Sequence, residues 1–154
     1  MSLFNLKNKS ILITGSSRGI GKAIAKHCAL HGANVIISSR KADVCQATTD
    51  EINELVGEEL AHSIPASISE PEQLEQLVLK TREKLGKIDV LICNAATNPF
   101  MGSMLDMPSD KFDKVMQNNI KSNQLLCNLV IPEMVERNDG SIIIISSIGG
   151  LKGS

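Results

Sequence analysis

The sequence has 154 residues, 42% hydrophobic and 21% charged, and its 16 basic and 17 acidic side chains leave a formal net charge of −1. This composition excludes an intrinsically disordered chain and provides no long-range attraction to nucleic acid or anionic lipid. With three phenylalanines, no tryptophan and no tyrosine, few aromatic faces are available for stacking on bases. A chain of this length buries roughly 70% of its unfolded surface, so we expect one domain over residues 1–154.

Neither a membrane-spanning segment nor a metal site is expected. The longest purely aliphatic run, residues 142–145, is far shorter than the roughly 20 residues that a membrane helix needs. The first residues lack the apolar stretch of a signal peptide, and the four cysteines are scattered without a Cys-x-x-Cys pair. Reduced thiols and a cytoplasmic location follow as expectations. His27 and His31 have the i,i+4 spacing of metal ligands, but no third ligand is evident.

Short apolar runs alternate with amphipathic helical patterns along the chain. Continuous apolar runs are typical of strands buried on both faces of a parallel sheet, and apolar residues three and four apart indicate helices. Pro132 lies inside the last helical pattern and should end the helix or bend it. The alternation predicts an α/β fold with a doubly wound parallel sheet. In chain order we expect strand 10–14, helix 19–30, strand 34–38, helix 43–56, a weaker strand 60–64, a helix capped by the Ser69 hydroxyl and ended by Gly86, strand 88–93, a loop over 94–108, helix 109–137 and strand 141–146.

A glycine-rich segment, Thr14-Gly-Ser-Ser-Arg-Gly-Ile-Gly21, joins the first predicted strand to the first predicted helix. Gly15 allows a tight turn, Gly19 lets the backbone approach a pyrophosphate, and Gly21 lets the helix pack on the strand. The free N–H groups at the start of the helix would then face the anion. The alternative is a glycine turn with a purely structural role.

The spacing Thr-Gly-x-x-x-Gly-Ile-Gly resembles the nucleotide loop of the short-chain dehydrogenase/reductase family, and three further motifs follow in the family's order. Asn94-Ala-Ala resembles the family's Asn-Ala-Gly segment, Asn119-Ile-Lys resembles its helix-borne Asn-Val-Lys, and Ser146-Ser-Ile-Gly-Gly resembles the segment that carries its catalytic Ser, here Ser147. The resemblance implies a Rossmann fold with strand order 3-2-1-4-5. It also implies cofactor binding by Gly15, Ser17, Arg18, Gly19, Ile20, Gly21, Asn94, Ala95 and Ala96.

The end of the second predicted strand bears on the choice of cofactor. An NAD-preferring site places Asp or Glu there to bind the ribose 2′-OH. Here Ser39 takes the place of the acid, and Arg40 is positioned to meet a 2′-phosphate with its forked guanidinium. Arg18 would supply a second cation, as it does in the family's NADP-using members; the alternative is two solvated surface arginines. The sequence therefore favours NADP(H), while Ser67 replaces the family's adenine-binding Asp with a hydroxyl that can still accept that bond.

The resemblance further implies hydride transfer between the cofactor and a small carbonyl or alcohol, with the nearest likeness to carbonyl reductases. In the family a Tyr gives the proton, a Lys in Tyr-x-x-x-Lys lowers its pKa, and the motif residues corresponding to Ser147 and Asn119 steady the substrate oxygen and order a water chain. The sequence holds no tyrosine, and the family register would place that residue beyond Ser154. The sequence is therefore either the N-terminal part of a longer protein, which we favour, or a truncated gene product. In both cases we expect it to be inactive by itself and to lack the family's later strands and helices.

Two functions stay open at this stage: an NADP(H)-dependent oxidoreductase, and a catalytically inactive nucleotide-binding half-domain. Ser147 has the alternative role of a strand-end cap, and Asn119 that of a polar helix residue. In the family the helix corresponding to 109–137 pairs with a later helix in the subunit contact, which implies a homodimer or homotetramer at full length. Without that partner we expect four apolar side chains to be partly uncovered: Val115, Ile120, Leu126 and Val130.

Overall fold

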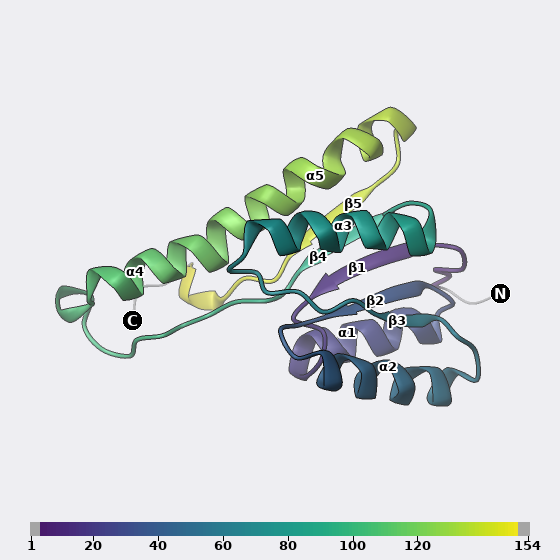
Figure 1. The fold of residues 1–154 in the computed structure, drawn as a ribbon, viewed down its shortest axis with the longest axis horizontal. Helices are drawn as coiled ribbons and strands as arrows, with labels where there is room; N and C mark the ends of the chain where they lie inside the picture. Colours follow the sequence, from purple (N-terminus) through teal and green to yellow (C-terminus); the bar gives the residue numbers. More distant parts are fainter. Residues whose placement is uncertain (1–3, 151–154) are drawn as a thin grey trace.

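The computed structural model describes residues 4–150 and shows the predicted alternation of strands and helices (Figure 1). The last three strands are shorter than predicted. None of the helices in the described part is long and apolar enough to cross a membrane. The elements are β1 (Ser10–Thr14), α1 (Gly19–Leu30), β2 (Asn34–Ser38), α2 (Ala42–Val56), β3 (Ala61–Ser63), α3 (Pro71–Leu85), β4 (Val90–Cys93), α4 (Ser109–Val115), α5 (Ser122–Arg137) and β5 (Ser141–Ile144).

The five strands form one parallel sheet in the order β3-β2-β1-β4-β5, which confirms the doubly wound architecture. Helices α1 and α2 cover one face, and α3 and α5 cover the other (Figure 1). The strand order reverses between β1 and β4. In open α/β sheets, ligands bind beyond the carboxyl ends of the strands at such a point, so the topology itself places the candidate site.

Alternate residues of each strand point to opposite faces, so every central strand feeds two apolar clusters. Leu12 of β1 packs in the cluster under α3 and α5, whereas Ile11 and Ile13 pack in the cluster under α1 and α2. All three side chains are buried. Burial on both faces explains why the strands read as continuous apolar runs rather than as alternating ones.

The long helical pattern over 109–137 is present but is not uniform. Between α4 and α5 the chain makes a π-helical segment, Met116–Lys121, which sequence reasoning did not foresee. Of the two alternatives predicted for Pro132, an end or a bend, the helix does not end there: α5 continues through it to Arg137, where the predicted pattern also ends. Buried Val130 and Met134 flank the proline, and their packing against the sheet holds the helix together across it.

Two other expectations need correction. Leu126 and Val130 are fully buried in the cluster with α3 and β4, because the described part of the chain already covers that face of α5. Ile120 is 55% exposed, as expected. Helix α3 is not capped by the Ser69 hydroxyl: its N-cap is Glu70, no side chain caps it, and Pro71 begins the helix.

Candidate nucleotide-binding site

A groove of about 480 Å³ lies at the carboxyl ends of the strands. A larger hollow, about 610 Å³, runs along the edge strand β3 and contains none of the predicted site residues. The predicted residues Gly21, Asn119 and Ser147 do not line the groove. The predicted residues that do line it are Gly15, Ser17, Arg18, Gly19, Ile20, Ser39, Arg40, Ser67, Asn94, Ala95 and Ala96.

Three glycines shape the turn between β1 and α1, each for a different reason. Gly15 has φ +65°, and a Cβ there would lie 2.9 Å from Ala95 Cα. At Gly21 a Cβ would meet the Gly15 carbonyl oxygen, so no side chain fits between the turn and α1. Gly19 has φ +56° and open space around it. That open space leaves the backbone at the start of α1 accessible to an anion.

Two hydroxyl groups that sequence reasoning missed anchor this turn. Buried Ser16 donates its hydroxyl proton to the Ile13 carbonyl at 2.7 Å and accepts the Ser38 N–H at 2.8 Å. Thr48 of α2 donates to the Ser17 carbonyl at 3.0 Å. Ser16 occupies a variable position of the glycine motif and Thr48 lies on a distant helix, so neither gave a signal in the sequence.

Asn94 fixes the other wall of the groove through its contacts with the end of β1. Its side-chain amide donates to the Thr14 and Gly15 carbonyls, each at 3.0 Å. The Thr14 hydroxyl in turn accepts the N–H groups of Asn94 and Ala95, each at 3.1 Å. The Asn94 side chain is therefore used to hold the loops together, and the backbone that follows it faces the groove.

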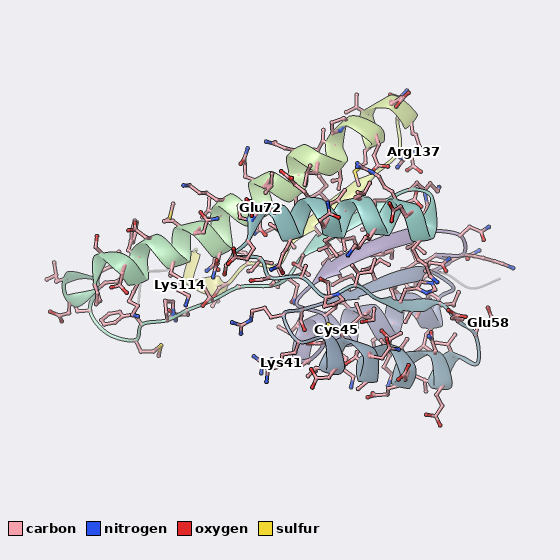
Figure 2. The ribbon with its side chains drawn as sticks, in the orientation of Figure 1. Lys41, Cys45, Glu58, Glu72, Lys114 and Arg137 are labelled. Atoms are coloured by element: carbon pink, nitrogen blue, oxygen red, sulfur yellow. The ribbon has the colours of Figure 1, made fainter. Side chains whose placement is uncertain are left out.

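The rim beyond β2 is cationic. Arg18 and Arg40 are exposed, and neither side chain has a hydrogen bond or ion pair within residues 4–150. Ser39 shares a hydrogen bond of 3.1 Å with the Cys45 thiol of α2, and Figure 2 labels Cys45 there with Lys41 just before the helix. Lys114 of α4 also lines the groove, and Glu70 is the one carboxylate among its described lining residues.

Ser67 stands on the loop between β3 and α3. Its N–H donates to Gln73 Oε1 at 2.8 Å, and its hydroxyl oxygen accepts the Ser69 N–H at 3.3 Å. A hydroxyl oxygen has a second lone pair and its own proton, so both remain available to a ligand in the groove.

The two predicted catalytic residues lie outside the groove lining. Asn119, in the π-helical segment, bonds the backbone of Thr97 through both ends of its carboxamide. Ser147 is exposed after β5, and its hydroxyl oxygen accepts the Gly149 N–H at 3.2 Å. The described part of the chain thus brings all the cofactor-binding candidates except Gly21 into the groove lining, and Ser147 is not among the lining residues.

The cysteine and histidine side chains singled out in the sequence lie outside the groove lining, except that Ser39 of the lining contacts the Cys45 thiol. Burial raises the pKa of Cys93, the last residue of β4, to about 12, and neighbouring Cys127 adds to the shift. Within residues 4–150 no group of three or more His, Cys, Asp or Glu side chains could hold a metal ion. The Nδ1 atom of His31 lies 2.8 Å from the His27 carbonyl, so that ring is engaged with its own helix.

The family model described as short chain dehydrogenase matches residues 9–154. The chain belongs to this family. Dehydrogenase/reductase SDR family member 4 of Bos taurus, a member of the short-chain dehydrogenase family, is 42% identical over 144 residues, covering 93% of this chain and 50% of the relative. The chain therefore spans about half the length of the curated relatives that it matches.

Solved short-chain dehydrogenase structures agree with the fold. A 7α-hydroxysteroid dehydrogenase complexed with NADH and 7-oxo glycochenodeoxycholic acid has a TM-score of 0.90 and 33% identity, covering 97% of this chain and 57% of that one. A metagenomic short-chain oxidoreductase in complex with NADP has a TM-score of 0.88 and 31% identity, covering 97% and 66%. One neighbour is thus described with NADH and the other with NADP.

Proposed function

We propose that the protein binds NADP(H) in the groove and, at full length, interconverts a small carbonyl compound and an alcohol by hydride transfer. The cofactor, when bound, donates or accepts the hydride. The observation that carries the choice of NADP(H) is the end of β2, where Ser39 and Arg40 stand and residues 38–41 include no carboxylate. Within residues 4–150 the Arg40 side chain has no hydrogen bond or ion pair.

The physical basis of this choice is the charge of the 2′-phosphate. A carboxylate at the end of β2 would accept hydrogen bonds from a ribose 2′-OH but would repel a phosphate, whereas a guanidinium bonds a phosphate with two parallel N–H groups. Arg18 faces the same groove and is equally free of partners within residues 4–150. Both side chains are available without the loss of an existing ion pair.

In this proposal the other residues of the groove each bind a different part of the dinucleotide. The backbone N–H groups from Ser17 to Gly21 receive the pyrophosphate at the start of α1, supported by the positive end of the helix dipole. Ser67 meets the adenine, and the backbone of Asn94, Ala95 and Ala96 lies along the ribose. Exposed Ile20 offers an apolar contact at the start of α1.

Catalysis needs groups beyond those in the groove. We assign Ser147 to stabilise the substrate oxygen and Asn119 to order the active-site water, as the family motifs imply. The 154 residues contain no tyrosine, so the family's proton donor is not among them. For this reason we expect residues 1–154 alone to bind the dinucleotide without turning over substrate.

Non-catalytic nucleotide binding is the second candidate function, favoured by the same absence of tyrosine. The two candidates separate in one assay, the oxidation of NADPH by the full-length protein in the presence of a simple diketone. Turnover above the rate without protein supports the reductase, whereas tight NADPH binding without turnover supports the binding module. The cytoplasmic location stays a prediction, to be checked by fractionation.

Self-association is part of the proposal. Apolar side chains remain exposed along the helix from α4 to α5, and a second copy would cover them. Sedimentation of the full-length protein should give a dimer or tetramer. The exposed side chains are Phe112, Met116, Ile120, Ile131 and Val135.

Replacing Arg40 by alanine tests the choice of cofactor. Loss of the charge-assisted bonds to the 2′-phosphate should raise the NADPH dissociation constant about 10- to 100-fold, with NADH little affected. The matched control is Lys41→Ala, which removes the adjacent cation; Lys41 does not line the groove. An equal effect of the two variants on NADPH, or no effect of either, would contradict the proposal.

A further inference from the structure

A second asparagine precedes Asn119 in the π-helical segment, and its situation is different. Asn118 lines the groove and is only 5% exposed. Its carboxamide oxygen is buried without a hydrogen-bond partner, and no described residue bonds either end of the carboxamide. Asn119 has a partner at both ends of its carboxamide, the backbone of Thr97, so the contrast lies within one turn of one helix.

A buried amide without a partner costs free energy, and the large majority of buried side-chain polar groups are paired. An apolar side chain at position 118 would avoid that cost in the ligand-free protein. Because Asn118 lines the groove, a ligand that enters the groove can reach its carboxamide. The unpaired carboxamide therefore points to a hydrogen bond completed by whatever occupies the groove.

The position of Asn118 indicates which part of the ligand its side chain would contact. Its segment continues into α5, which packs beside α3 on one face of the sheet. The loop that leads into α3, with Ser67, also lines the groove, as does the end of β2. In a doubly wound sheet these elements surround the adenosine half of a dinucleotide.

We propose that Asn118 hydrogen-bonds the adenosine half of the bound dinucleotide and thereby sets its position in the groove. This inference rests on the proposed NADP(H) binding. A carboxamide offers one acceptor and two donors side by side, which matches the donor and acceptor pair on the edge of adenine. Lys114, one turn earlier on α4, lines the same wall and has no ion pair within residues 4–150.

The test is Asn118→Leu in the full-length protein, with Gln117→Leu as the control. Leucine has a similar volume but no hydrogen-bonding group, and Gln117 is a neighbour that does not line the groove. The probes are NADPH and adenosine 2′,5′-bisphosphate, which shares only the adenosine half. We expect Asn118→Leu to weaken both about tenfold, to leave the melting temperature of the ligand-free protein unchanged or higher, and Gln117→Leu to change neither affinity.

Several outcomes would overturn the inference. Unchanged affinity for both probes would show that Asn118 does not contact the ligand. A loss of affinity for NADPH alone would show that Asn118 contacts the nicotinamide half instead. A lower melting temperature with unchanged affinities would make Asn118 a structural residue. If Asn118→Leu does not fold, Asn118→Ser carries the same affinity test. Wild-type protein that binds neither NADPH nor NADH would refute the proposed function itself, whereas tight binding unaffected by the variants refutes only this inference.

Discussion

The carboxamide of Asn119 bonds the backbone of Thr97 in both directions: Oδ1 accepts the Thr97 N–H at 2.8 Å, and Nδ2 donates to the Thr97 carbonyl at 2.9 Å. This pair ties the π-helical segment to the loop that follows β4. Because both ends of the carboxamide bond the Thr97 backbone, the Asn119 side chain holds the conformation of the loop beside the groove.

Replacing Asn119 by alanine should therefore release the loop. We expect hydrogen exchange at the Thr97 amide to accelerate at least tenfold and the free energy of unfolding to fall by about 1–2 kcal/mol, because two hydrogen bonds are lost. Asn123→Ala is the control, because Asn123 bonds the Asn119 carbonyl instead of the loop. Unchanged exchange at Thr97 would show that the pair does not hold the loop.

Gly21 and Gly19 should respond differently to alanine. A Cβ at Gly21 would collide with the Gly15 carbonyl, so Gly21→Ala should cost more than about 2 kcal/mol of stability in thermal or chemical denaturation. At Gly19 the space is open and only the positive φ is strained, at about 1 kcal/mol. Gly19→Ala should instead act mainly on nucleotide affinity, because the added methyl group stands where a pyrophosphate approaches. Equal losses of stability in the two variants would refute this distinction.

Ser39→Asp should reverse the cofactor preference. The carboxylate would accept the hydrogen bonds of a ribose 2′-OH and repel a 2′-phosphate, so NADPH affinity should fall and NADH affinity should rise, each by about tenfold. Ser39→Asn, which adds similar bulk without charge, controls for the loss of the contact with Cys45. If the ratio of NADPH affinity to NADH affinity is the same in wild type and Ser39→Asp, the 2′-phosphate does not bind beside the end of β2.

Cys93 should make the protein less stable in alkaline solution. Burial raises the pKa of its thiol to about 12 from an ordinary value of 9.0, so the folded protein keeps the proton while the unfolded chain releases it. The free energy of unfolding should fall as the pH rises from about 9 towards 12, since above pH 9 the unfolded state binds fewer protons. The measurement is denaturant unfolding at pH 8 and pH 10.5, with Cys93→Val as control. If the free energy of unfolding falls equally with pH in wild type and Cys93→Val, the raised pKa of Cys93 is not the cause.

The sequence predicted the sheet, and it marked most of the residues that line the groove, because both depend on local signals. An apolar run such as residues 11–13 favours a buried strand, and the glycine spacing favours the turn that follows. The groove lining then collects residues from four strand ends that the motifs had already marked, such as Arg40 and Ser67. Their proximity follows from parallel strands that end on one edge of the sheet.

What the sequence missed depends on contacts between distant residues. Ser16 and Thr48 anchor the glycine turn through partners that no local pattern reveals. Pro132 is tolerated because side chains on both sides of it are buried against α3 and the sheet, a tertiary effect that outweighs the local cost of the proline. Asn118 and Asn119 look alike in sequence, and only the structure shows that one carboxamide is satisfied and the other is not.

The central claim is tested most directly by titrating NADPH and NADH separately into the full-length wild-type protein and following binding by calorimetry. We predict that both dinucleotides bind in competition for one site and that NADPH binds at least tenfold more tightly, through the guanidinium groups of Arg18 and Arg40. Equal affinities, tighter binding of NADH, or no binding of either would contradict it.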